Sequence, residues 1–223
     1  MKEILTEWRK FINESIDPRI QKQLDALIDG GYGIEISEGE ARTKIKIVHL
    51  DKSRLDQPRG SGFVIIKKTE PTLHGPCFKG WAIDYSKAGE NQGLGPLLYE
   101  IAIEWASKNG SGLMPDRQEV SDEAWQVWDK YIQRSDVKNR QMDIEDDDGR
   151  YSRYYGRNVD RDTIGKLQQI TPDIEIDDCD QVQSVQDNGE FWEESPLSKI
   201  YRKTNTEVMD ALERAKKLFT VKG

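Results

Sequence analysis

Apolar residues recur at the helical spacing of about 3.6 residues in five stretches of the chain. The spacing predicts amphipathic helices over residues 1–14, 17–30, 96–109, 121–132 and 208–219. Asp17–Pro18 and Ser121 are typical helix starts, and Gly30–Gly31 and Asn109–Gly110 are typical stops. The fourth helix has the most regular period, so we expect its apolar stripe to be buried: Ala124, Val127, Trp128 and Tyr131.

Shorter apolar runs and alternating apolar and polar residues predict strands. These strands cover residues 33–37, 44–50, 62–68 and 78–85, with shorter ones over 112–115 and 197–203. The turn at Glu38-Gly39-Glu40 is short, so the first three strands are expected to form an antiparallel meander. The pattern as a whole predicts an α/β (α+β) domain.

A glycine-rich turn joins the strand over 78–85 to the helix that Pro96 begins. Gly93 and Gly95 lie where free backbone N–H groups and the positive end of a helix dipole converge, so a pyrophosphate could approach closely. The alternative is an ordinary strand–turn–helix connection that needs glycine only for its backbone dihedrals. Spacing alone leaves both interpretations open.

Composition narrows the function classes. The net charge is −8 and basic residues form only short pairs, which argues against broad attraction to nucleic acid or anionic membranes and leaves a local basic pocket open. Two cysteines and two histidines are too few for a zinc site or a disulfide framework, so we expect no metal and a reducing compartment. No apolar run reaches the length of a membrane span.

The predicted organisation is one domain with additions. Residues 1–14 form the opening helix, 15–135 the domain, and 136–223 an irregular, acidic, loop-rich extension with a closing strand and terminal helix packed on that domain. The acidic stretches 143–149 and 173–180 are interpreted as solvated loops. A calcium loop starting at Asp143 is excluded, because its sixth and twelfth positions hold Asp148 and Tyr154.

The element order and the window Glu90-Asn91-Gln92-Gly93-Leu94-Gly95 resemble the GNAT-type acetyltransferases, whose turn is patterned Gln/Arg-x-x-Gly-x-Gly/Ala. The resemblance covers residues 20–135 and implies a mixed, mostly antiparallel twisted sheet with flanking helices. It implies acetyl-coenzyme A as cofactor, bound at its pyrophosphate by the turn and at its pantetheine arm by the preceding strand, while the strand over 113–115 splays away. The cofactor-binding residues that it implies are Ile83, Tyr85, Gln92, Gly93, Leu94, Gly95 and Leu97. Glu90 departs from the pattern, since the family has a neutral or basic residue there.

The family's next signature is a helix patterned Asn-x-x-Ala-x-x-x-Tyr, whose tyrosine protonates the departing thiolate. This chain has Ser121 and Trp128 at the first and last positions, and indole cannot act as a general acid. Tyr131, one turn on, is the candidate substitute; the alternative is a core tyrosine. Asp84 and Glu35 are candidate general bases, and the alternative for each is an ordinary surface acid.

A second resemblance covers the whole chain, through segments such as Gly112-Leu113-Met114 and Ser195-Pro196-Leu197-Ser198-Lys199, and is to GNAT-like proteins of tailed bacteriophages. Trp8 to Glu14 is similar to capsid-targeting peptides that a head protease removes after Ile/Leu-x-Glu, and Ile12-Asn13-Glu14 fits that rule. The alternative is a helix that docks on the domain. The resemblance implies the host cytoplasm as location, or packaging in the virion.

The leading hypothesis is a phage-encoded protein that binds an acyl-coenzyme A and transfers an acetyl group to an amine of a host or phage protein or of a small molecule. The partners expected are that acceptor and the phage capsid, without nucleic acid or membrane. The main alternative is a catalytically inactive virion-associated protein that keeps the fold, which Glu90 and Trp128 favour. A third is a host-directed binding protein that uses the acidic extension.

Overall fold

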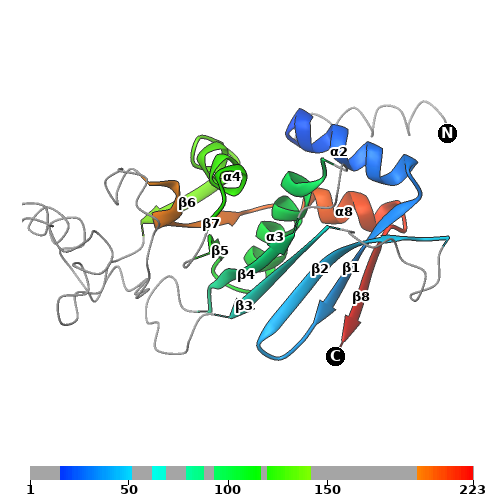
Figure 1. The fold of residues 1–223 in the computed structure, drawn as a ribbon, viewed down its shortest axis with the longest axis horizontal. Coiled ribbons are helices and arrows are strands. Elements are labelled where there is room, and N and C mark those ends of the chain that lie inside the picture. Colours follow the sequence, from blue (N-terminus) through cyan, green and yellow to red (C-terminus); the bar gives the residue numbers. More distant parts are fainter. Residues whose placement is uncertain are drawn as a thin grey trace, which may run out of the picture. The chain divides into compact units, whose positions relative to one another are not determined.

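The computed structural model describes residues 16–51, 62–68, 79–87, 93–116, 120–141 and 195–222. These residues form a mixed α/β fold with four α-helices and one eight-stranded, mostly antiparallel sheet, which confirms the coarse fold prediction (Figure 1). The strand order across the sheet is β6-β7-β5-β4-β3-β2-β1-β8. The strands are β1 (Tyr32–Glu38), β2 (Arg42–His49), β3 (Phe63–Lys68), β4 (Trp81–Lys87), β5 (Leu113–Met114), β6 (Val137–Gln141), β7 (Lys199–Lys203) and β8 (Leu218–Lys222). The helices are α2 (Pro18–Asp29), α3 (Gly95–Asn109), α4 (Asp122–Ile132) and α8 (Glu207–Arg214), with a 3₁₀ turn η3 (Pro196–Ser198).

The chain divides into two compact units. The first comprises residues 1–66, 84–105 and 205–223, and the second comprises 67–83 and 106–204. Strands β3 and β4 and helix α3 each begin in one unit and continue into the other.

In the first unit, helices α2 and α8 lie on one side of strands β1, β2 and β8 (Figure 1). In the central part of β1 and β2, alternate residues are fully buried, among them Ile34, Ile36, Ile45 and Ile47. The apolar stripes of α2 and α8 are buried as well, through Leu24, Leu27, Val208 and Leu212. The buried residues of the strands and the apolar stripes of the helices therefore face one another and form the core of the unit.

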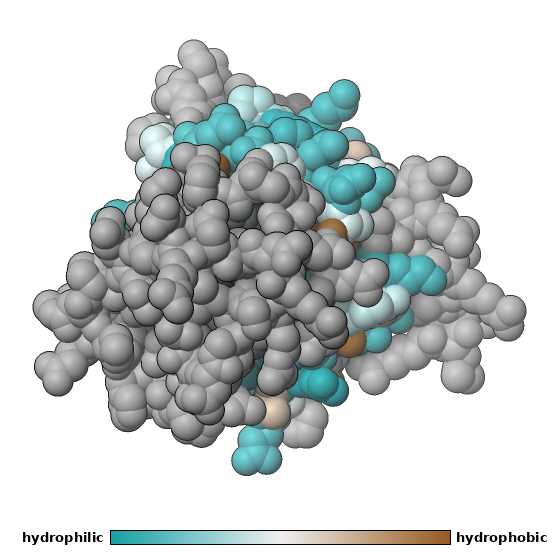
Figure 2. Space-filling view, turned by 60° about the vertical axis from the view of Figure 1, so that its left-hand side comes forward, coloured by the Kyte–Doolittle hydropathy of each residue, from teal (hydrophilic) through white to brown (hydrophobic). Residues whose placement is uncertain are grey.

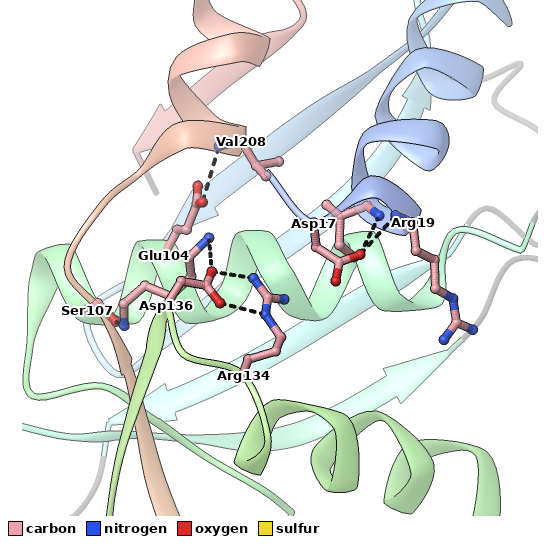
Figure 3. A network of polar contacts seen from close by, with 9 residues as sticks. Asp17, Arg19, Glu104, Ser107, Arg134, Asp136 and Val208 are labelled. Atoms are coloured by element: carbon pink, nitrogen blue, oxygen red, sulfur yellow. Dashed lines mark hydrogen bonds and ion pairs between the residues drawn. The ribbon is translucent and has the colours of Figure 1, made fainter. Parts of the chain in front are cut away.

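Helix α2 begins and ends as its sequence predicts. The Asp17 carboxylate accepts hydrogen bonds from the backbone N–H groups of Arg19 and Ile20, at 2.8 and 3.3 Å (Figure 3). Gly30 caps the other end, and Gly31 follows with a φ of +74°. The meander is also confirmed in its first hairpin, where β1 and β2 pair antiparallel across Gly39.

In the second unit, β7 pairs antiparallel with both β5 and β6, and β4 pairs parallel with β5. Ser121 caps α4 through a hydrogen bond from Ala124 N–H, at 3.3 Å. Trp128 and Tyr131 on α4 are buried, as expected, whereas Ala124 and Val127 are only half-buried. An aromatic cluster joins Trp128, Tyr131 and Tyr201, with ring centroids 5.0 to 6.3 Å apart.

Two predictions about the C-terminal part were wrong. The expected helix over 208–219 ends at Arg214; Lys216 adopts a φ of +58°, and Phe219 lies on strand β8. The physical reason is that β1 has an open edge, and β8 pairs with it in parallel from Leu218 to Lys222. Strand β6 was also missed, because its five residues alternate too weakly to be recognised.

The described surface is mostly hydrophilic on the face shown in Figure 2, with scattered hydrophobic spots. This agrees with a chain in which charged residues make up 33%. Within the described ranges, none of the helices has the length and apolar character needed to cross a membrane. Residues 1–14, the acidic stretches and both cysteines lie outside the described residues.

Candidate anion-binding turn

The predicted glycine turn forms the N-terminus of helix α3, in the first unit. The first backbone bond of the helix runs from Leu98 N–H to the Leu94 carbonyl, at 3.2 Å. The N–H groups of Leu94, Gly95 and Leu97 precede it and have no acceptor among the described residues, and Pro96 has no N–H. No acidic side chain occupies the first turn of α3. Three donors at the positive end of a 15-residue helix therefore form a surface that favours an anion.

The two glycines of the turn have different requirements. Gly93 has a φ of +60°, which L side chains rarely adopt, so its backbone conformation by itself accounts for glycine there. Gly95 does not have a positive φ, and among the described residues beyond its chain neighbours and its own helix backbone, a Cβ added to it would meet no heavy atom within 4 Å. Neither dihedral angle nor packing requires glycine at position 95. The open space beside it is what a ligand in close contact with the backbone would need.

Two contacts hold the turn and the neighbouring strand. Gln23 on α2 donates from Nε2 to the Gly93 carbonyl, at 2.7 Å. The hydroxyls of Ser86 on β4 and Tyr99 on α3 share a hydrogen bond of 3.0 Å. The turn is thus connected to α2, and the strand before it to the helix after it.

Asp84, a predicted general base, lies on β4 and pairs with Arg42 on β2. Arg42 Nε lies 3.0 Å from Asp84 Oδ2, and its Nη2 lies 3.5 Å from Oδ1. The Asp84 side chain is only 16% exposed, whereas that of Arg42 is 66% exposed. An amine that approaches Asp84 must therefore share this carboxylate with an exposed guanidinium group.

Glu35, the other predicted base, lies elsewhere. It alternates with the buried residues Ile34 and Ile36 on β1, so its side chain points to the sheet face opposite the one that α2 covers. Its register partner is Lys46 on β2, and Ser37 donates to it at 3.4 Å. The structure does not bring Glu35 together with the turn, which is joined to α2.

Tyr131, the predicted substitute acid, belongs to the second unit. It is 3% exposed, lies in the aromatic cluster and has the Arg134 guanidinium 5.2 Å from its ring centroid. This is the placement that a core tyrosine would have. Trp128, at the family's tyrosine position, is 1% exposed in the same cluster.

The expected pantetheine-binding residues lie on β4. Strand β5 pairs with β4 only at Trp81 and Ala82, so Ile83 and Tyr85 have no ladder partner in β5. Tyr85 is 54% exposed, and its ring lies 5.7 Å from that of Phe63 on β3. Gln92 and Glu90, which complete the motif, lie outside the described residues.

Sequence reasoning missed Gln23 and Arg42, since each is distant in sequence from the residue it holds and carries no motif of its own. Comparison of the chain with protein-family models, curated proteins and solved structures gave no match. No group of side chains in the described ranges has the composition of a metal site.

Proposed function

We propose that this protein binds acetyl-coenzyme A at the turn from Gly93 to Leu97 and transfers the acetyl group to an amine. The observation that carries the proposal is Gly95: a glycine that neither dihedral nor packing requires, with open space beside it and free N–H groups around it. Backbone donors at a helix N-terminus with no obstructing Cβ suit a pyrophosphate.

Strand β4 supports the cofactor assignment. Its residues beyond Ala82 have no pairing with β5, as the GNAT resemblance expects of a strand that receives a pantetheine arm. In this proposal the N–H groups of Leu94, Gly95 and Leu97 hold the pyrophosphate, and the main chain of Ile83 to Tyr85 holds the arm. The bound cofactor would supply an acetyl thioester. Asp84 would take the proton of the attacking amine as the amide bond forms, and coenzyme A would leave through cleavage of the carbon–sulfur bond.

Gly95→Ala tests the cofactor site. The added methyl group meets open space in the free protein, so thermal stability should stay unchanged or rise slightly, as for a Gly→Ala change in a helix. If the pyrophosphate occupies that space, calorimetry should show about tenfold weaker binding of acetyl-coenzyme A. Gly95→Asp, which adds a charge, should abolish binding.

Two results of the calorimetry would contradict the proposed cofactor site. Wild-type protein that gives no heat and no thermal stabilisation at millimolar acetyl-coenzyme A contradicts the proposal. Equal binding by wild type and both variants would show that the cofactor binds elsewhere.

The second candidate function is an inactive virion-associated protein that retains the fold. Burial of Trp128 in an aromatic cluster, at the position of the family's acid, is the observation that favours it. It predicts no release of free thiol from acetyl-coenzyme A with any of a panel of amines, and detection of the protein in purified phage particles. The active protein would instead act in the host cytoplasm.

A further inference from the structure

The contact between Gln23 and Gly93 joins two residues that are 70 positions apart in the sequence. Both residues belong to the first unit. The Gln23 Nε2 group donates to the Gly93 carbonyl at 2.7 Å, a short distance for a bond between an amide and a carbonyl. The carbonyl at the start of the candidate anion site is therefore held by a side chain from another element.

The geometry of the peptide bond links this contact to the orientation of the Leu94 N–H group. The Gly93 carbonyl and the Leu94 N–H belong to one peptide group, which is planar and trans, so they point in opposite directions. With the carbonyl held against Gln23, the Leu94 N–H points away from Gln23. That N–H has no acceptor among the described residues.

Helix α2, which carries Gln23, is held by buried side chains and a capped N-terminus. Ile20 and Leu27, which lie about one helical turn before and after Gln23, are 4% and 0% exposed. Asp17 caps the start of the helix. The Gln23 Oε1 atom is shielded from solvent and has no hydrogen-bond partner in the described part of the chain. Among the described residues, the Gln23 amide therefore makes one hydrogen bond, and that bond is to the turn.

We propose that Gln23 is a positioning residue of the anion site, which aims the Leu94 N–H at the bound pyrophosphate by holding the Gly93 carbonyl. The inference rests on the proposed function and adds to it a residue outside the glycine motif. Gln23 itself does not touch the ligand. Its contribution is to keep one donor oriented before the anion arrives, which lowers the ordering cost of binding.

Gln23→Leu removes the donor and keeps a side chain of similar size. Loss of one oriented hydrogen bond should weaken coenzyme A binding about three- to tenfold in calorimetry. Binding of pantetheine, which has no pyrophosphate, should not change. In amide NMR spectra, the Leu94 resonance should shift on addition of coenzyme A in wild type and shift much less in Gln23→Leu. Gln23→Lys, which restores a donor of similar reach, should recover the NMR response.

Gln21 supplies the matched control. It lies on the same helix, and its Nε2 donates to Asp25 rather than to the turn, at 2.8 Å. Gln21→Leu and Gln21→Lys should bind coenzyme A as wild type does, and the second controls for the charge in Gln23→Lys.

Failure of the positioning role of Gln23 can be distinguished from failure of the proposed function. If wild type binds coenzyme A and Gln23→Leu binds it equally well, the positioning role is wrong and the proposed function stands. If wild type binds no coenzyme A, the proposed function fails first. Equal weakening of coenzyme A and pantetheine binding would also overturn the inference, because it would indicate a general effect on the fold.

Discussion

Asp136 is a partly buried carboxylate that lies between two cations in the second unit. Arg134 Nε donates to Asp136 Oδ1 at 2.9 Å (Figure 3). Lys203 Nζ lies 3.7 Å from Asp136 Oδ2. Burial acts to raise the pKa of Asp136, but the hydrogen bond from Arg134 and the charges of Arg134 and Lys203 outweigh it, so the pKa lies below its usual value. The Lys203 side chain is only 1% exposed, and the Asp136 carboxylate offsets part of the cost of burying its charge.

The lowered pKa predicts how stability changes with pH. A carboxyl group whose pKa is lower in the folded protein stabilises the fold above its unfolded pKa, about 3.9, and this contribution is lost as pH falls through the folded value. Asp136→Asn should therefore be less stable than wild type by about 1–3 kcal/mol at neutral pH. Urea unfolding should show the difference shrinking below about pH 4. A difference that stays constant down to pH 2 would contradict this assignment.

At the scale of elements, helix α8 depends on a residue of helix α3. Thr206, at its N-cap position, makes no side-chain capping bond. Instead both carboxylate oxygens of the fully buried Glu104 accept hydrogen bonds from the helix. Val208 N–H donates to one oxygen at 3.1 Å (Figure 3), and Met209 N–H donates to the other at 2.8 Å. A negative group at a helix N-terminus satisfies free donors and interacts favourably with the dipole. Glu104 thereby fixes α8, and the β8 strand that follows, to α3.

Glu104→Gln tests this contact. The amide can accept one of the two N–H groups but carries no charge, so the variant should lose about 1–3 kcal/mol of unfolding free energy. Amide hydrogen exchange should rise first at Val208 and Met209. Glu213→Gln, on the exposed last turn of α8, is the matched control and should change stability by less than about 0.5 kcal/mol. Similar exchange in both variants would mean that the cap contributes little.

At the scale of the whole molecule, the first described helix has a start of its own. Ile16 is 3% exposed, Asp17 caps α2 and Pro18 occupies its first turn. The helix therefore needs no residue before Ile16 to satisfy its first donors. The sheet joins the earliest and latest described strands, since β1 pairs with β8.

We therefore expect that deletion of residues 1–14 leaves the unfolding free energy within about 0.5 kcal/mol of wild type in denaturant melts. If the segment is a targeting peptide cut after Glu14, mass spectrometry of mature phage heads should find Ser15 at the amino terminus. The rival interpretation is a docked helix, which would bury Trp8, Phe11 and Ile12. In that case the deletion would cost several kcal/mol.

The sequence by itself determined most local structure. Capping residues and hydrophobic period were enough to predict α2, α4, the first hairpin, strand β4 and helix α3, because these features depend on neighbours within a few residues. It also predicted the burial of Trp128, since a regular apolar stripe has to be covered.

Only the tertiary structure decided which distant residues meet. Phe219 continues a helical period but lies on a strand, because the open edge of β1 offers backbone partners that outweigh local preference. The partners of Asp84, Gly93 and the α8 N-terminus come from positions 42, 23 and 104, and no local pattern marks them. Such contacts depend on how the chain folds back on itself, and a hydrogen bond between residues 70 positions apart leaves no periodic trace in the sequence.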